Sequence, residues 1–539
     1  MKATRAKRNV WALGIVRAIA ARELRDHLVS ARFRLILGTT LVLTLLSTLA
    51  GTFNYRVQAE QYQMSIERAE QKLHEATTWS ELQPILVRAV APLMILNAGF
   101  ETSDGRVVIT SNGQIPATTE DAPVGTPYLA RFSEFDVTTV LVYLLGLLAV
   151  LLSFDAVSGE RERGTLALSF SNSLTRWQVI FGKYLGGIIA LALALAASTL
   201  VALIVWFLSG VHFPSAEWPR ITLWLLAILI YLSAMFWIGL LISVLTRRTS
   251  SSLLVAMVAW FAFVIFIPVV AAFAARQLVR SPSSYALENE MSRLNVELEQ
   301  RSADFKKSLG TPPESEGFSV SIEQGVSMNF YSPETYEWWI KYYSERAEME
   351  REYALKVYDA IKESQDRNRA QADMAFKLSA LSPVVHLERV ADELTGTSRN
   401  DAYYFMEAAR RYRQSLIDFY DDNHLTTSLR WITDDPPGTE SPFPKGTKLG
   451  EKASTEEETE TELGKKMYAQ VMAERESGKR ALPVNEIPQF NYQPQSLNRA
   501  TSKIFSSIVA LIMLNLLCAA AVYLRFKRYD VRRGSAEGV

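Results

Sequence analysis

Six long apolar runs dominate this sequence, and each is long enough for a helix to cross a bilayer whose hydrocarbon core is about 30 Å thick. Long polar segments follow the first and the fifth run. Because backbone groups inside a membrane must bond to each other, the pattern predicts an all-α integral membrane protein with six transmembrane helices plus a mainly helical extracytoplasmic domain. The predicted spans are 35–53, 136–153, 184–209, 219–245, 252–275 and 503–524.

The charge distribution predicts the orientation of these spans. Residues 1–34, 154–183, 246–251 and 525–539 together hold 20 Lys and Arg against 7 Asp and Glu, whereas the rest of the chain holds 37 against 50. Connections rich in Lys and Arg stay in the cytoplasm. Six crossings then place both termini and the 154–183 loop in the cytoplasm. The segments 54–135 and 276–501 lie outside.

The first 34 residues are predicted to form a cytoplasmic interfacial helix. From Val10 to Ser30, apolar side chains recur near one face and arginines lie on others. Such a helix lies in the headgroup region of a membrane. A basic leader that only fixes the orientation of the first span fits the residues equally well. The leader is longer than that of an ordinary signal peptide, so we expect the first span to be retained.

Composition predicts several helices in the two outer segments. Residues 54–80 contain neither Gly nor Pro, so the first span should continue outward as a helix. Helices are also expected at 284–309, which prolines end, and at 333–378, which begins with a proline. The stretch 381–422 predicts a helix pair with a turn at Gly396 and Thr397.

Two outer stretches are expected to be non-helical. Residues 105–115 alternate polar and apolar side chains before Asn112 and Gly113, which favours a strand and a tight turn. Residues 433–461 are rich in Pro, Gly, Ser, Thr and Glu, which is typical of a loop. The single cysteine, Cys518, lies in the last apolar run, so no disulfide can join the outer segments.

The loop at 154–183 carries the most distinctive pattern in the chain. It contains ERERGTL, then TRW and then GK, between two membrane-spanning runs, so it is held against one face of the bilayer. Charged and aromatic side chains at such a place suit a docking surface for another protein, although a plain solvated loop would also be charged. The candidate interface residues are Glu160, Arg161, Glu162, Arg163, Gly164, Thr165, Leu166, Arg176, Trp177 and Lys183.

This pattern resembles the first cytoplasmic loop of ABC-2 type ABC transporter permeases, which reads close to ERE, any residue and GTL, followed by a turn, Arg, an aromatic residue and GK. The chain departs from it at Arg163, where a small residue is usual, and at Leu174, where Pro or Ile is common. REL at 22–24 fits the interfacial helix of that family. The stretch 381–422 resembles a subgroup with a large extracytoplasmic insertion before the last transmembrane helix.

The resemblance implies a permease subunit of an ATP-driven transporter, most often an exporter, in the bacterial cytoplasmic (inner) membrane. In that family the loop is a coupling helix that rests on a separate ATP-hydrolysing subunit. The implied partners are a cytoplasmic ABC ATPase dimer, which binds the ATP and Mg, and a second permease that is identical or paralogous. Membrane lipid and an extracytoplasmic partner protein complete the expected set, and no nucleic acid is expected.

Motifs for catalysis are missing from the sequence. No GxxxxGK[ST] phosphate-binding loop, HExxH metal site or GxSxG nucleophile is present, so we expect no catalytic residue, bound cofactor or metal in this chain. His386 and His424 are expected to be ordinary surface histidines.

Two other classes of function remain as alternatives. No ionisable residue lies in the middle of a predicted span, which disfavours an ion-coupled carrier. The stronger alternative to a permease is a membrane-anchored assembly or sensory protein whose outer helical domain binds a partner. Copurification with an ATPase would separate these two classes.

Overall fold

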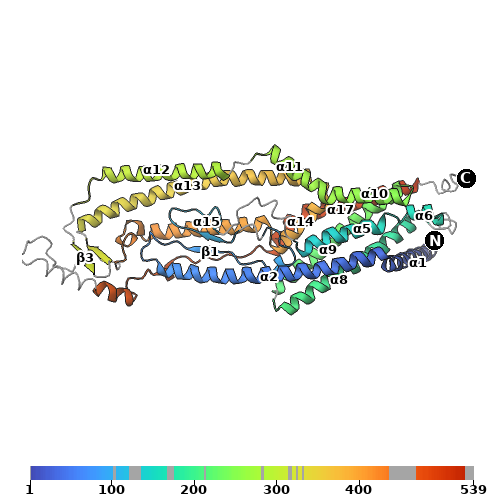
Figure 1. Ribbon diagram of the computed structural model, residues 1–539, viewed down its shortest axis with the longest axis horizontal. Coiled ribbons are helices and arrows are strands. Elements are labelled where there is room, and N and C mark those ends of the chain that lie inside the picture. Colours follow the sequence, from blue (N-terminus) through green and yellow to red (C-terminus); the bar gives the residue numbers. More distant parts are fainter. Residues whose placement is uncertain are drawn as a thin grey trace, which may run out of the picture.

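The computed structural model describes residues 2–100, 105–120, 135–166, 175–211, 214–280, 284–313, 318–322, 326–330, 333–435 and 469–528. The molecule is elongated, with a bundle of helices at one end and a second group of helices at the other (Figure 1). Both chain termini lie at the far end of the first bundle (Figure 1).

Within the described residues, six helical segments are long and apolar enough to cross a membrane, which confirms the predicted fold class. Each contains one of the predicted apolar runs, and each has an 18-residue stretch with at most two charged residues. They are α2 (Ala31–Glu75), the segment Val137–Glu162, α8 (Arg176–Ser209), the segment Ser215–Leu245, the segment Thr249–Leu278 and α17 (Leu497–Lys527).

Three of these segments consist of several helical elements. The second contains α4 (Val137–Val140), a π-helical turn (Leu141–Leu145), α5 (Gly146–Ser153) and α6 (Ser158–Glu162). The fourth joins a 3-10 turn (Ser215–Glu217) to α9 (Trp218–Leu245). The fifth joins α10 (Thr249–Phe261) to α11 (Ile267–Leu278) through a π-helical turn (Ala262–Phe266).

The membrane bundle packs around α5 and α9, which are its most buried helices. The Tyr231 hydroxyl of α9 donates to the Val142 carbonyl at 3.1 Å, and Gly146 leaves room for its ring. The Trp224 indole donates to Thr138 Oγ1 at 3.1 Å. These two buried polar side chains are thus hydrogen-bonded, as a low-dielectric interior favours.

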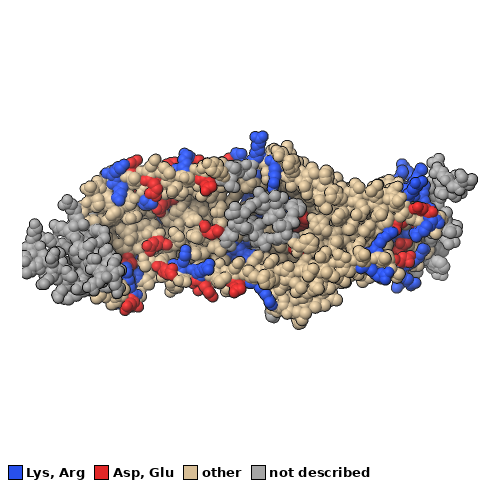
Figure 2. Space-filling model, in the orientation of Figure 1, with Lys and Arg blue, Asp and Glu red and all other residues tan. Residues whose placement is uncertain are grey.

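A band of the surface without charged side chains surrounds this bundle on the face shown in Figure 2. Charged side chains gather beyond the band at the end that holds the termini, and again over the second group of helices (Figure 2). Exposed arginines at the terminal end include Arg22, Arg25, Arg34, Arg163, Arg247 and Arg248. A charge-free belt between two charged regions is the surface that a lipid bilayer requires.

As predicted, the first span continues as a helix beyond its apolar stretch, because α2 ends only at Glu75. Beyond it, β1 (Ile85–Val87) pairs antiparallel with β2 (Val107–Ile109), which is the predicted strand. A 3-10 turn (Pro92–Ile95) follows β1. The predicted turn at Asn112 is held by other elements: Arg413 Nε donates to the Ser111 carbonyl at 3.0 Å, and Asn112 Nδ2 donates to the Ala347 carbonyl at 2.8 Å.

Two long antiparallel helices form one side of the second group of helices, here called the outer group because the charge pattern predicts its segments outside the cytoplasm. They are α12 (Ser284–Ser308) and α13 (Pro333–Leu378), at the predicted positions. An unpredicted pair of strands, β3 (Phe318–Ile322) and β4 (Val326–Phe330), lies between them in the chain.

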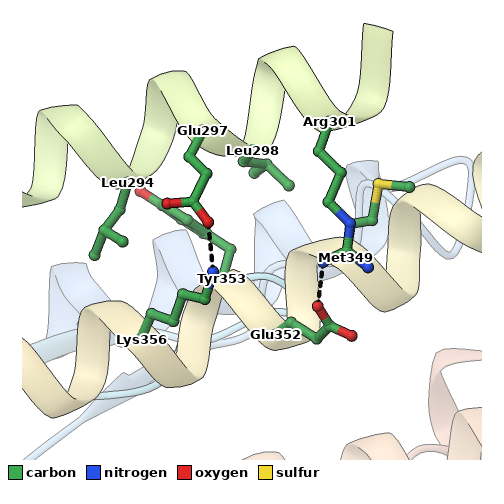
Figure 3. Close-up of a pocket in the computed structure, with 8 residues that line it drawn as sticks. All are labelled: Leu294, Glu297, Leu298, Arg301, Met349, Glu352, Tyr353 and Lys356. Carbon is green, nitrogen blue, oxygen red and sulfur yellow. Dashed lines mark hydrogen bonds and ion pairs between the residues drawn. The ribbon is translucent and has the colours of Figure 1, made fainter. Parts of the chain in front are cut away.

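The contact between α12 and α13 is a packing seam with charged edges (Figure 3). Lys356 Nζ lies 2.6 Å from Glu297 Oε1, and Arg301 pairs with Glu352. Leu294 and Met349 are among the residues that line a cavity of about 20 Å³ between the helices. Such a cavity has room for a single water, so this seam is not a substrate pocket.

The helix pair predicted at 381–422 is present as α14 (Pro383–Thr395) and α15 (Arg399–Asp422), and the turn between them begins at Gly396, with φ of 71°. α14 belongs to the outer segment by sequence, yet it packs against α9 and α17. Its apolar side chains join the core cluster of the membrane bundle: Val384, Leu387, Val390, Ala391 and Leu394.

The expectation of a surface histidine is wrong for His386, which is 7% exposed on α14. Its Nε2 lies 2.8 Å from the Ala380 carbonyl. His386 is buried because it packs against the end of α13, where its ring lies edge-on to Phe376 with 5.3 Å between centroids, a contact that the sequence pattern alone did not reveal. His424 is exposed.

The last part of the outer group returns the chain to the membrane. Short 3-10 turns occupy Leu425–Thr427, Leu429–Trp431 and Val484–Glu486, and residues 469–476 are helical. Most of the loop predicted at 433–461 lies outside the described residues.

Candidate functional site

The 154–183 loop begins on α6, which serine hydroxyls fix to two spans. Ser243 Oγ of α9 accepts hydrogen bonds from the N–H groups of Val157 and Ser158 at 3.0 and 3.1 Å. The Ser252 hydroxyl of α10 donates to the Phe154 carbonyl at 2.5 Å. The first N–H groups of a helix lack partners within it, so Ser243 supplies acceptors that α6 needs.

Lys183, in α8, lies at the centre of a buried ion cluster. Its Nζ is 2.7 Å from Glu23 Oε1 and 2.8 Å from Glu160 Oε1. The lysine side chain is 4% exposed, and the glutamate side chains are 13% and 12% exposed. An ammonium group has three donors and no acceptor, so two carboxylates suit it, and a buried charge persists only with such partners. The cluster therefore joins one residue from each of three sequence motifs: GK in α8, ERE in α6 and REL in the first helix.

The first helix, α1 (Lys2–Val29), reaches this cluster because it lies along the start of α8. Two glycines of α8 make the contact close. A Cβ at position 182 would lie 2.7 Å from Ile19 Cγ2, and a Cβ at position 186 would lie 2.8 Å from the Ala20 carbonyl oxygen. Both distances are shorter than a van der Waals contact, so a larger residue would clash at each position and glycine is required. α1 therefore packs against the bundle and also carries charged side chains on its exposed face.

Glu162, at the end of α6, caps the fifth span. Its Oε2 accepts hydrogen bonds from Thr249 N–H at 3.0 Å and from Thr249 Oγ1 at 2.5 Å. Arg248, at the N-cap of α10, makes no side-chain capping bond of its own. A carboxylate at a helix N-terminus also interacts favourably with the helix dipole. α6 is thereby tied to the beginning of the fifth span.

The far end of the loop is tied to the last span. α8 starts with a capping box between Thr175 and Gln178. Arg176 Nη1 donates to the Phe526 carbonyl at 2.7 Å and also to the Lys527 carbonyl, so a cation covers the C-terminal end of α17. The Trp177 ring lies edge-on to Tyr523, with 5.7 Å between centroids.

Among the described residues of the loop, the stretch Glu162–Thr165, here called the loop tip, faces solvent. Glu162, Arg163, Gly164 and Thr165 are exposed, and Gly164 has a φ of 73°, a conformation that glycine adopts easily. Arg163 Nε donates to the Gly159 carbonyl at 3.1 Å, which leaves the rest of its guanidinium at the surface. An exposed, charged tip on a fixed base is suited to contact with another protein.

Comparison with known proteins identifies the family. Residues 17–531 match the family described as ABC-2 family transporter protein. The chain belongs to this family. Two relatives are named "Probable ABC transporter permease protein NosY". The one from Pseudomonas aeruginosa is 46% identical over 57 residues, and the one from Stutzerimonas stutzeri is 43% identical over 56. These stretches cover 11% and 10% of this chain, and 21% and 20% of the relatives.

The chain is therefore a multi-pass membrane protein of a transporter permease family. Among the residues that the structure describes, no group of His, Cys, Asp and Glu is arranged to hold a metal ion.

The structure separates the predicted interface residues of the permease by position. Glu160 and Lys183 come together in the buried cluster, and Leu166 is also buried, so these three are not available to a partner in this conformation. Trp177, which is 43% exposed, is open to solvent in addition to the loop tip. Arg161 is half-buried, and residues 167–174 lie outside the described part of the chain.

Sequence reasoning missed two residues that the permease uses at this site. Glu23 is one of only two acids among nine basic residues in 1–34, and a rare acid in a basic helix could have suggested a partner for Lys183. Thr249 gave no signal, because its importance comes from the approach of Glu162 across the bundle.

Proposed function

We propose that this permease forms the membrane half of an ATP-driven exporter and that a separate ABC ATPase docks on the exposed loop tip at Glu162–Thr165 and on Trp177. ATP and Mg bind to the ATPase. The outward direction of transport rests on the family resemblance. The proposal also places both termini in the cytoplasm and the protein in the bacterial inner membrane.

The observation that carries the proposal is the Lys183 cluster, because it converts the loop into part of a rigid unit. A push on a flexible loop would be absorbed locally. Here Lys183 joins α6 to α1 and α8, while Glu162 joins α6 to α10. A force applied at the tip is thereby delivered to the third and fifth spans together.

The last span is connected to the same unit through Arg176. α17 runs from this contact to the outer group, where α14 packs against it. ATP-driven closure of the ATPases would then change the position of the spans and of the outer helices in one step. Rigid-body displacement of packed helices is a common form of such coupling.

A second permease subunit, identical or paralogous, completes the proposed transporter. The fifth span supports this, because only 11% of the residues in its most apolar 18-residue stretch are buried within one chain. Such apolar faces contact either lipid or another subunit. An extracytoplasmic partner would bind the outer helices.

Charge reversal at the loop tip tests the docking. Arg163→Glu changes an exposed side chain that lies outside the Lys183 cluster, so folding should be unaffected. We expect at least a tenfold loss of ATPase copurifying with the tagged permease, since like charges across a docking contact cost several kcal/mol and lower the rate of association.

Arg247→Glu is the matched control, because it reverses an equally exposed charge on the connection between the fourth and fifth spans. It should leave copurification within about twofold of the wild type. Equal ATPase binding by Arg163→Glu and the wild type would contradict docking at the tip. No ATPase with any variant, wild type included, would contradict the proposed function itself.

A further inference from the structure

The fifth span contains a π-helical turn whose hydrogen bonds are incomplete within the helix. The Ile267 N–H bonds to the Ala262 carbonyl, five residues earlier. In the same pattern, the next N–H would bond to the Phe263 carbonyl, but residue 268 is proline and has no N–H. The Phe263 carbonyl therefore loses its donor, inside a membrane where no water replaces it.

Ser382 supplies the missing donor from a different part of the chain. Its hydroxyl lies 2.5 Å from the Phe263 carbonyl oxygen, and its side chain is fully buried. Ser382 occupies the N-cap of α14, where a serine usually bonds to its own helix, yet it makes no such bond here. Pro383, at the first helical position, has no N–H, so it removes one of the unpaired donors at the start of α14.

This joint lies within the membrane layer. Phe263 is 14 residues beyond Thr249, which is about 21 Å along a helix with a rise of 1.5 Å per residue. The hydrocarbon core is about 30 Å thick. Ser382 therefore reaches below the outer surface of the bundle, and the chain returns outward through α14.

The two halves of the fifth span are held by different parts of the molecule. α10, before the π turn, is tied to the loop by Glu162 and by Ser252. α11, after the turn, packs along α13 of the outer group, and Gln371 Nε2 donates to the Val279 carbonyl at 2.9 Å. A π turn with a proline is a common site of helix bending. The joint thus divides a segment linked to the loop from one linked to the outer helices.

We propose that Ser382 is the latch of a hinge in the fifth span, through which movement at the cytoplasmic loop reaches the outer helices. Ser382 is a positioning residue, since it sets the bend by completing the open turn. The source of the movement, ATP binding by a docked ATPase, rests on the proposed function, whereas the latch itself does not.

Amide hydrogen exchange of the full-length chain in lipid nanodiscs tests the latch. Ser382→Ala should speed exchange of the amides at 262–267 by about 3- to 20-fold, the range expected for loss of a side-chain hydrogen bond inside a membrane. Ser382→Thr keeps the hydroxyl and should retain slow exchange. Ser379→Ala is the control, because Ser379 is also buried but its hydroxyl bonds only within α13.

Pro268→Ala provides a second, independent test. It restores an N–H that can bond to the Phe263 carbonyl, so Ser382→Ala should have little further effect in that background. Two results would overturn the latch. One is exchange in Ser382→Ala at the wild-type rate, and the other is an equal effect of Ser382→Ala with Pro268 present and with Pro268 replaced.

The transmission is measured in the complex with the ATPase that copurifies with the chain. A non-hydrolysable ATP analogue should alter exchange in α13 of the wild type, and Ser382→Ala should lose at least half of that change. A full response in Ser382→Ala would refute the hinge as the route. No response in the wild type would count against the proposed function while leaving the exchange result at 262–267 to stand separately.

Discussion

Replacement of Lys183 by methionine is the sharpest test of the buried cluster. The substitution keeps a long side chain at position 183 but leaves Glu23 and Glu160 without their shared cation. Both carboxylate oxygens lie within 2.8 Å of Lys183 Nζ, so they are at most about 5.5 Å apart. Two negative charges at that separation repel by about 3 kcal/mol at an effective dielectric of about 20. This agrees with the roughly 3–5 kcal/mol that loss of one member of a buried ion pair costs.

We therefore expect Lys183→Met to lower the free energy of unfolding by about 3–5 kcal/mol. The triple variant with Glu23→Gln and Glu160→Gln removes the unpaired charges as well. It should recover to within about 1 kcal/mol of the wild type, because neutral groups often replace a buried ion cluster without loss of stability. The assay is unfolding of the detergent-solubilised chain in increasing SDS, followed by tryptophan fluorescence.

Arg22→Met is the control for this prediction. It breaks the pair with Asp26, whose atoms are 3.7 Å apart and whose side chains are 71% and 62% exposed, and such pairs contribute little. A loss below about 1 kcal/mol for Lys183→Met, or a triple variant no more stable than the single one, would refute the reasoning.

Two further predictions concern the outer group and the topology. Burial, together with Asp401 and Asp392, raises the pKa of Glu393 although Asn400 and Lys503 oppose the shift. The folded state therefore holds this proton more tightly, and the wild type should lose stability as pH rises from about 4.5. Glu393→Gln should lose less stability than the wild type between pH 4.5 and 8, as measured by the melting temperature at each pH. An unchanged pH dependence would disprove this prediction. In a Cys518→Ala background, an impermeant thiol reagent should label Asp366→Cys in intact cells but Ser250→Cys only after permeabilisation, and labelling at 250 in intact cells would overturn the orientation.

Local signals explain why the helices were predictable. The spans are continuous apolar runs, and membrane insertion acts on each run separately. α13 begins at Pro333 and α15 follows Gly396, residues whose backbone preferences act at their own positions. The β3–β4 pair was missed although both strands, FSVSI and VSMNF, alternate apolar and polar residues, which is a local signal of the same kind.

The sequence predicted that the docking loop lies at a surface, but it did not predict how the loop is held in place. Its charges and its place between two spans indicated a cytoplasmic contact region, and the exposed tip at Arg163–Thr165 fits that interpretation, which stays a prediction. Lys183, however, was expected at the surface with the others. Its burial depends on α1, since Glu23 is 160 residues away in the chain.

The sequence by itself determined the six spans, the main outer helices and the distribution of charge between the two ends, because each depends on the composition of one continuous stretch. Only the tertiary structure decided that Lys183 binds two carboxylates, that α14 packs inside the membrane bundle, and that Ser382 completes the turn opened by Pro268. Each of these depends on a donor and an acceptor that lie far apart in the chain. Their pairing becomes favourable only when packing removes both from water.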